Sequence, residues 1–191
     1  MNDSSPAANR IASIRQRLLD GAKARDEDFQ FVLDRYAVER LLYRLSKSPD
    51  RDRFILKGAM LFALWFGQPH HPTRDADFLG FGPSDPEQLA DTIRRLCDIQ
   101  ADDGLCYETD SITVETIREE AKYDGLRATL RALLGNARCT VQWDVGFGDA
   151  VTPGPLEADY PVLLDDMPAP QLRVYPRETV FAEKLEAIAQ L

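Results

Sequence analysis

Apolar residues recur at helical spacing in three stretches of the chain. They fall three or four positions apart over residues 9–24 and 28–45, which predicts two amphipathic helices. A third, very apolar helix is expected over residues 59–66. A fourth is expected over residues 85–99, because it opens with an aspartate, a proline and, three positions after the aspartate, a glutamine, a typical helix start.

The middle of the chain changes to an alternation of apolar and polar residues, which is typical of strands. Residues 126–133 and 138–147 alternate on either side of a short Gly135-Asn136 turn and predict a hairpin. Residues 152–170 are rich in proline and aspartate and are expected to be irregular. Further strands are expected at residues 53–57, 75–80, 111–117 and 172–175, and a last helix from residue 176 onward.

The order of these elements predicts an α+β fold, with a small mixed or antiparallel sheet flanked by helices. We expect an N-terminal helical segment at residues 1–50 and a core at residues 51–191.

The composition of the chain is that of an ordinary globular protein, with 44% hydrophobic and 29% charged residues among 191. The chain contains no apolar run near the roughly 20 residues of a membrane span. Together with three widely spaced cysteines and a polar start, this predicts a cytoplasmic protein.

Basic residues gather in two stretches, although the net charge is -9. The stretches comprise Arg10, Arg15, Arg17, Lys23 and Arg25, and then Arg44, Lys47, Arg51, Arg53 and Lys57. They are either solvated helix faces or a local track for a polynucleotide on an otherwise acidic body. The acidic balance argues against a whole surface built for nucleic acid.

Two aspartates one residue apart stand at the start of the expected strand at residues 75–80. Asp75 and Asp77 share one face of that strand, while Ala76 and Phe78 face the core. Two close carboxylates repel each other unless a cation lies between them, and Mg²⁺ binds carboxylate and phosphate oxygens. Such a pair is also common in plain turns, so the metal interpretation depends on neighbouring motifs.

Two neighbouring motifs support a metal and phosphate site. The first expected strand runs through Gly58 into a helix, which presents backbone N–H groups to a phosphate unless Gly58 is simply a turn residue. Asp144 interrupts a later apolar strand, where it is either solvent-exposed or a third carboxylate beside Asp75 and Asp77. In the second case the arrangement predicts a site for Mg²⁺ or Mn²⁺ and a nucleoside triphosphate (NTP).

These motifs resemble the nucleotidyltransferase superfamily, in the form found in AbiEii/AbiGii-type toxins and MenT-type enzymes. The resemblance rests on Lys57-Gly58-Ala59, on Thr73-Arg74-Asp75-Ala76-Asp77-Phe78, and on residues 123–127, 143–149 and 178–187. It covers residues 54–191. The chain departs from the superfamily at Ala59, where glycine or serine is usual, and so lacks a hydroxyl there.

The resemblance implies roles for particular residues. Asp75, Asp77 and Asp144 would bind Mg²⁺ or Mn²⁺, and Lys184 would contact the triphosphate. The spacing of the last helix agrees, because Lys184 shares a face with apolar residues. The Gly58-Ala59 turn would bind nucleotide, with Lys57, Arg74 and Arg127 as further candidates for nucleotide contacts.

The activity implied is transfer of a nucleoside monophosphate from an NTP, with release of pyrophosphate. The protein would be the toxin of a bacterial toxin–antitoxin or phage-defence pair, with a cognate antitoxin and an RNA (tRNA) or protein acceptor. Two alternatives stay open: a nucleotidyltransferase acting on a small molecule such as an aminoglycoside, which predicts a compact acceptor pocket, and a non-catalytic interaction domain. Because the family continues past the Lys184 helix, the core is expected to be truncated at Leu191.

Overall fold

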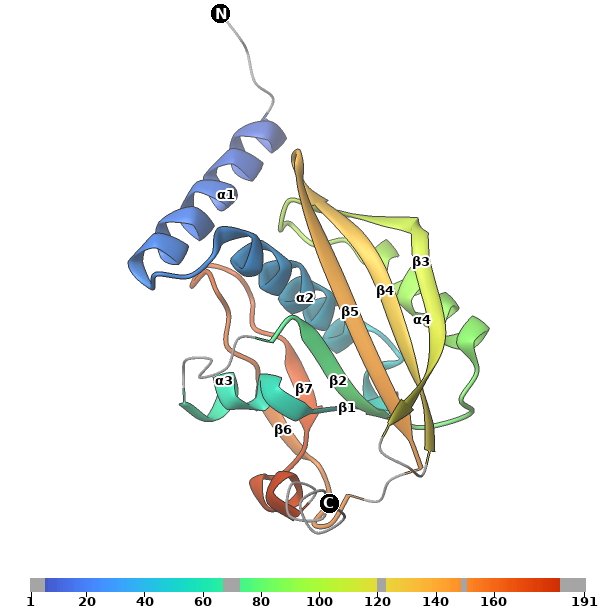
Figure 1. Cartoon of the computed structure of the whole chain (residues 1–191). Coiled ribbons are helices and arrows are strands. Elements are labelled where there is room, and N and C mark those ends of the chain that lie inside the picture. Colours follow the sequence, from blue (N-terminus) through green and yellow to red (C-terminus); the bar gives the residue numbers. More distant parts are fainter. Residues whose placement is uncertain (1–5, 67–72, 120–122, 149–150, 183–191) are drawn as a thin grey trace, which may run out of the picture.

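The computed structural model describes residues 6–66, 73–119, 123–148 and 151–182, and a seven-stranded mixed sheet dominates it (Figure 1). The strands lie in the order β3-β4-β5-β2-β1-β7-β6. They are β1 Phe54–Lys57, β2 Asp75–Gly80, β3 Leu105–Glu119, β4 Tyr123–Leu134, β5 Ala137–Phe147, β6 Leu156–Asp159 and β7 Gln171–Val174. The helices are α1 Pro6–Ala24, α2 Phe29–Lys47, α3 Leu61–Phe66 and α4 Pro86–Asp98, with 3-10 turns η1 Arg51–Arg53 and η2 Gly58–Met60. Residues 177–182 are also helical. The predicted α+β fold class is confirmed.

The centre of the sheet combines parallel and antiparallel pairing. Strand β2 runs parallel to β5 and antiparallel to β1, and β1 runs parallel to β7. Strands β3, β4 and β5 follow one another as antiparallel neighbours. The predicted hairpin is confirmed, because Leu134 pairs with Ala137 across a two-residue turn in which Gly135 has a φ of 64°. A positive φ at this position matches the twist of the two strands.

Helices α2 and α4 lie behind the β3-β4-β5 part of the sheet in Figure 1 and pack against it. Asp28 caps α2, since its Oδ1 accepts the N–H of Phe31 at 2.8 Å. Asp85 caps α4 by accepting the N–H of Glu87 at 2.9 Å, which confirms the helix start predicted there. The two helices thus bury one face of these strands and leave polar side chains to the other.

Three aromatic rings join the central strands on the buried face. The rings of Phe78 and Trp143 stack with their centroids 4.5 Å apart, and Phe54 meets them edge-on at 5.9 and 5.6 Å. Pairs of this kind contribute about 0.5–1.5 kcal/mol each beyond their burial. Because Phe78 follows Asp77 and Trp143 precedes Asp144, this cluster fixes both aspartates on the opposite face of the sheet.

A buried ion pair ties α2 to the segment before β3. Arg44 Nη1 lies 2.5 Å from Asp103 Oδ2, and the two side chains are 4% and 2% exposed. Two buried tyrosines reinforce the same contact. The Tyr36 hydroxyl donates to the carbonyl of Asp103 at 2.9 Å, and the Tyr107 hydroxyl donates to the carbonyl of Ala37 at 2.7 Å.

Three elements differ from the sequence-based expectation. Residues 152–170 are not wholly irregular, because they contain β6, which pairs antiparallel with β7. Strand β3 begins at Leu105, well before residue 111, and the helix expected at residues 59–66 opens with the turn η2. Strand β6 is mostly exposed at the edge of the sheet, and its four residues are too short a run to identify as a strand within a segment rich in proline and aspartate. Its pairing is set by contacts far away in the sequence.

The cysteines of the chain are unpaired, and burial affects their reactivity. All three cysteines are free thiols, and burial raises the pKa of Cys97 and of Cys139 to about 12, so neither is a ready thiolate nucleophile.

Across the described ranges, no helix has both the length and the apolar character that crossing a membrane requires.

Candidate active site

Four charged side chains form a row across neighbouring strands. Asp77 of β2 lies directly opposite Lys57 of β1 on one side and Asp144 of β5 on the other. Asp144 in turn lies opposite Arg127 of β4. Directly opposed positions share a face of the sheet, with Cβ atoms about 4.5–5.5 Å apart. The strands that carry Asp77 and Asp144 are therefore neighbours, and the row reads cation, anion, anion, cation.

Asp75 lies two residues before Asp77 on the same face, opposite Gln142 of β5. Partial burial and then the negative charge of Asp144 raise the pKa of the Asp75 carboxyl, while the positive charges of Arg127 and Arg74 lower it by smaller amounts. A neighbouring anion raises a carboxyl pKa because two like charges cannot easily ionise together. The Asp75 carboxylate therefore stands in a negative field that a cation would relieve.

Gly58 lies directly against Asp77. Its φ is 72°, and a Cβ at this position would collide with Oδ2 of Asp77 and lie 2.9 Å from the Cβ of Asp77. Only glycine combines this backbone conformation with the space that Asp77 needs. The backbone of Gly58, at the start of η2, therefore lies beside the Asp77 carboxylate.

Arg127 holds Asp144 through two parallel hydrogen bonds. Its Nε donates to Oδ1 at 2.9 Å and its Nη2 to Oδ2 at 2.7 Å. The Gln142 amide donates to Oδ2 as well, at 3.1 Å. The Asp144 side chain is 7% exposed, so its buried charge is balanced by the guanidinium. Both oxygens that Asp144 would offer to a metal are engaged by Arg127.

The donor set fits a divalent cation at Asp75 and Asp77, with Asp144 as a third ligand only if Arg127 moves. Carboxylate oxygens are the protein ligands that Mg²⁺ prefers, and the negative field at Asp75 favours a cation. Within the part of the chain that the structure describes, however, no three His, Cys, Asp or Glu side chains are arranged to hold an ion.

Sequence comparison identifies the family. The profile described as "Nucleotidyl transferase AbiEii toxin, Type IV TA system" matches residues 40–191. The chain belongs to this family. The motif resemblance to this family is thus confirmed. The match begins inside α2, and the division of the chain after residue 50 stays a prediction.

Two solved structures share the fold: a candidate nucleotidyltransferase from H. pylori and JHP933 from Helicobacter pylori. Each aligns with a TM-score of 0.50 over 83% of this chain, at 14% and 15% sequence identity. The chain spans 59% and 57% of their lengths, less than two thirds of either. No curated protein sequence matches the chain.

In this AbiEii-family chain, the other predicted nucleotide-binding residues lie at different distances from the row. Lys57 is a member of it, opposite Asp77. Ala59 follows Gly58 in η2, so its backbone belongs to the candidate phosphate turn. Lys184 lies outside the described residues, and its predicted contact with the triphosphate stays a prediction.

Arg74 is directed toward α2 rather than toward the row. Its Nε lies 3.8 Å from Oδ2 of Asp34, and its guanidinium lies over the ring of Phe31 at 5.5 Å from the centroid. A contact between Arg74 and a nucleotide would therefore require it to leave these partners.

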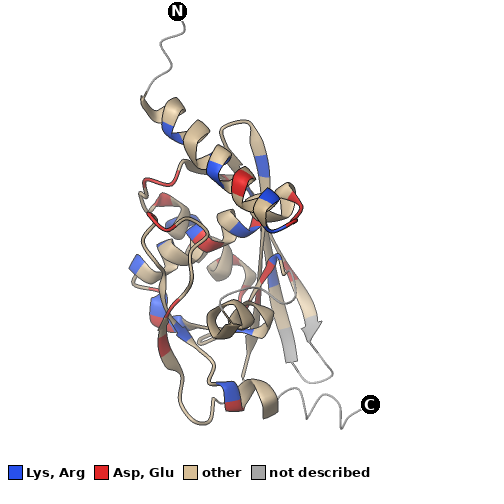
Figure 2. Cartoon of the chain, turned by 90° about the vertical axis from the view of Figure 1, so that its left-hand side faces the viewer, with Lys and Arg blue, Asp and Glu red and all other residues tan. Residues whose placement is uncertain are grey.

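Much of the charge of the two basic stretches is matched by carboxylates. The pairs are Arg10–Asp102 at 2.7 Å, Arg17–Asp166 at 2.6 Å, Arg25–Glu27 at 2.7 Å, Arg53–Asp50 at 2.9 Å, the buried Arg44–Asp103, and Arg51 with Glu157. Figure 2 shows basic and acidic positions interleaved along the ribbon. Exposed pairs add little stability, but they cancel the local positive field. The structure therefore favours solvated, locally neutral faces over a polynucleotide track along these stretches.

Two features near the site were missed at the sequence level. Gln142 supports Asp144, and its signal was its place on the polar side of an alternating strand. Glu39 is a buried acid that lines a pocket beside η2. The feature of the sequence that could have indicated it is its position one helical turn after Arg35, among the apolar residues of α2.

Proposed function

We propose that this AbiEii-family protein transfers a nucleoside monophosphate from an NTP to a hydroxyl group of an RNA acceptor such as tRNA, with Mg²⁺ or Mn²⁺ as its cofactor. The observation that carries the proposal is the position of Asp77, between the Gly58 turn on one side and Asp144 on the other. This arrangement brings a carboxylate pair and phosphate-binding N–H groups into one place.

In this proposal the cation and the triphosphate have separate holders. Asp75 and Asp77 hold the cation, which neutralises developing charge on the phosphates when bound. The backbone N–H groups of the Gly58-Ala59 turn and the ammonium group of Lys184 hold the triphosphate. Lys57 and Arg74 are further phosphate contacts, the latter after it leaves Asp34.

Arg127 and Asp144 act as an exchangeable pair. Without nucleotide, Arg127 balances the buried charge of Asp144. When a phosphate enters, the guanidinium turns to its oxygens, and Asp144 becomes free to complete the cation site and to accept the proton of the attacking hydroxyl. The hydroxyl oxygen bonds to the α-phosphorus, the bond from that phosphorus to the bridging oxygen breaks, and pyrophosphate leaves. Positioning and charge neutralisation suffice without a nucleophilic side chain.

The nature of the acceptor separates this proposal from its alternatives. A small-molecule transferase requires a compact pocket facing the reacting phosphate. The structure has a compact pocket, but Asp77 and Asp144 do not line it. A non-catalytic interaction domain would not need the close contact between Gly58 and Asp77. The toxin–antitoxin family also implies a cognate antitoxin as a partner.

The test uses each of the four NTPs labelled at the α- or the γ-phosphate. The chain is incubated with Mg²⁺ and, in separate reactions, total tRNA, a protein mixture or an aminoglycoside. The proposal predicts that α-label moves to tRNA, that γ-label does not, and that pyrophosphate is released. Transfer to the aminoglycoside or to protein alone contradicts the RNA acceptor, and transfer of γ-label contradicts nucleotidyl transfer.

A further inference from the structure

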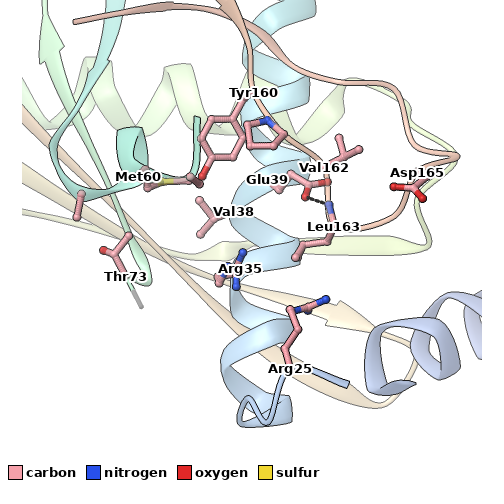
Figure 3. Close-up of a pocket in the computed structure, with 13 residues that line it drawn as sticks. Arg25, Arg35, Val38, Glu39, Met60, Thr73, Tyr160, Val162, Leu163 and Asp165 are labelled. Carbon is pink, nitrogen blue, oxygen red and sulfur yellow. Dashed lines mark hydrogen bonds between the residues drawn. The ribbon is translucent and has the colours of Figure 1, made fainter. Parts of the chain in front are cut away.

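A second site lies beside the η2 turn. It is a pocket of about 280 Å³ between α2, the η2–α3 segment and residues 160–165 (Figure 3). Ala59 and Met60 line it, whereas Asp75 and Asp77 do not. The turn therefore borders both features: Gly58 contacts Asp77, and the next two residues form a wall of the pocket.

The pocket contains a buried and half-satisfied carboxylate. Glu39 is 3% exposed, and its Oε2 accepts the N–H of Leu163 at 2.7 Å. Its Oε1 has no hydrogen-bond partner among the described residues, because Arg40 Nε is 3.7 Å away and too distant to donate. A buried acceptor without a partner costs about 1–3 kcal/mol, so Glu39 favours a ligand that brings a donor.

A guanidinium lies one helical turn away on the same wall. Arg35 and Glu39 are four residues apart on α2, so their side chains share a face of the helix, and Figure 3 shows both at the pocket with Val38. Instead of bonding Glu39, Arg35 donates to Glu27 Oε1 at 3.1 Å. The Arg35 guanidinium and the Glu39 carboxyl group thus both line the pocket, and Arg35 bonds Glu27 rather than Glu39.

The remaining walls are mainly apolar. The apolar part comprises Val38, Met60, Ala63, Pro161 and Val162, and Arg25, Thr73, Tyr160 and Asp165 are the further polar or charged lining residues. Apolar walls with a few polar groups at fixed positions are typical of small-molecule sites, and a volume of about 280 Å³ is at the lower end of that class. The site therefore suits a compact molecule with one apolar group and two charged groups.

We propose that this pocket binds a small zwitterion, an α-amino acid with a compact apolar side chain. Its ammonium group donates to Glu39 Oε1, its carboxylate accepts from Arg35, and its side chain packs against Val38 and Met60. A simple cation would meet the guanidinium of Arg35, and a simple anion would meet the carboxylate of Glu39. Only a ligand with both charges satisfies both groups.

Occupation would act on the turn beside Asp77. A ligand against Met60 restricts η2, and through Gly58 it restricts the position of the Asp77 carboxylate. This regulatory consequence rests on the proposed nucleotidyl transfer, whereas binding of the amino acid does not.

The binding test measures calorimetric affinity of the whole chain for L-valine, L-leucine and L-methionine. Two analogues of leucine complete the set: 4-methylpentanoate, which lacks the ammonium group, and 3-methylbutylamine, which lacks the carboxylate. We expect at least one amino acid to bind, and leucine to bind about tenfold or more tightly than either analogue, since each analogue lacks one of the two charged contacts. No binding by any of the three amino acids overturns the proposal, as does an analogue that binds as tightly as leucine.

Variants test the residues. Glu39→Gln and Arg35→Gln should each weaken binding about tenfold or more, whereas Arg131→Gln, in an exposed ion pair on β4, should not. Val162→Trp fills the pocket and should abolish binding even if Glu39→Gln proves unstable. Asp77→Asn should bind the amino acid like the parent chain, so a failure of nucleotidyl transfer is distinguishable from a failure of this site. Unchanged binding by Glu39→Gln and Val162→Trp contradicts the assignment.

Discussion

Asp77 and Asp144 stand directly opposite each other on the parallel strands β2 and β5. Two buried or half-buried carboxylates at this spacing repel each other, and the protein answers with a cation on each flank, Lys57 opposite Asp77 and Arg127 bonded to Asp144. The row is therefore neutral without a bound cation, and a metal or a triphosphate changes its balance. This relationship explains why a basic residue stands at each end of the carboxylate pair.

Gly58→Ala should disable the site while leaving the fold intact. The added Cβ would collide with the Asp77 carboxylate, and a positive φ costs a non-glycine residue roughly 1–2 kcal/mol. We expect about a 100-fold loss of transfer activity from displacement of Asp77. Gly154→Ala is the matched control, because its Cβ would meet nothing within 4 Å. Equal activity in the two variants would contradict the role of the turn.

Arg127→Ala should destabilise the protein more than Arg131→Ala, although both arginines project from β4 and pair with a carboxylate. Loss of Arg127 leaves the buried Asp144 without its partner, at a cost of about 1–3 kcal/mol. The Arg131–Glu108 pair is exposed, so its loss should stay within about 0.5 kcal/mol. Urea unfolding measures both changes.

Added Mg²⁺ should restore stability to Arg127→Ala more than to the parent chain, because the freed Asp144 then joins Asp75 and Asp77 as a cation ligand. Thermal unfolding with and without Mg²⁺ checks this difference. An identical response of the two proteins would argue against Asp144 as a ligand.

Glu39 should make stability fall as the pH rises toward neutrality. Burial raises the pKa of Glu39 from 4.5 to about 7, against the opposing charges of Arg40 and Arg35 and with a small contribution from Asp103. The folded protein binds this proton more tightly than the unfolded chain, so the stabilisation is fully present below pH 4.5 and is lost as the pH rises through 7. The loss amounts to about 3 kcal/mol. Chemical unfolding at pH 5 and 7.5 should show this slope in the parent and not in Glu39→Gln; the same slope in both would refute it.

Arg44→Met should be among the most destabilising changes in α2. It leaves Asp103 charged and buried without its partner, which costs about 3–5 kcal/mol. Arg94→Met removes an exposed pair with Asp91 on α4 and should change the free energy of unfolding by less than about 0.5 kcal/mol. Comparable losses in the two variants would mean that the Arg44 pair does not hold the fold.

Much of the fold could be predicted from local pattern. The limits of β2, the helix start at Asp85 and the Gly135-Asn136 turn follow from alternation, capping and turn chemistry, which depend on neighbouring residues. Strand β6 could not be predicted, because its four residues are too short a run to identify and only its pairing with β7 makes it a strand.

The candidate site likewise has features that local sequence predicts and features that depend on pairing between distant strands. The shared face of Asp75 and Asp77 follows from strand geometry within one strand. That Asp144 lies next to Asp77 depends on the pairing of β5 with β2, which the structure shows. That Arg127 would bond both oxygens of Asp144 depends on pairing across β4 and β5, which a single sequence does not specify. The gap between Arg35 and Glu39 likewise depends on Glu27, which draws Arg35 away.

The central claim is that Asp77 holds the cation that nucleotidyl transfer requires. The most direct test compares the parent chain, Asp77→Asn and the exposed control Asp91→Asn for transfer of α-label from each NTP to total tRNA, with Mg²⁺ and with chelator. The account predicts labelling by the parent and by Asp91→Asn only with Mg²⁺, and a loss of about 100-fold or more in Asp77→Asn with its melting temperature preserved. Equal labelling by Asp77→Asn and the parent, or labelling that persists in chelator, would contradict it.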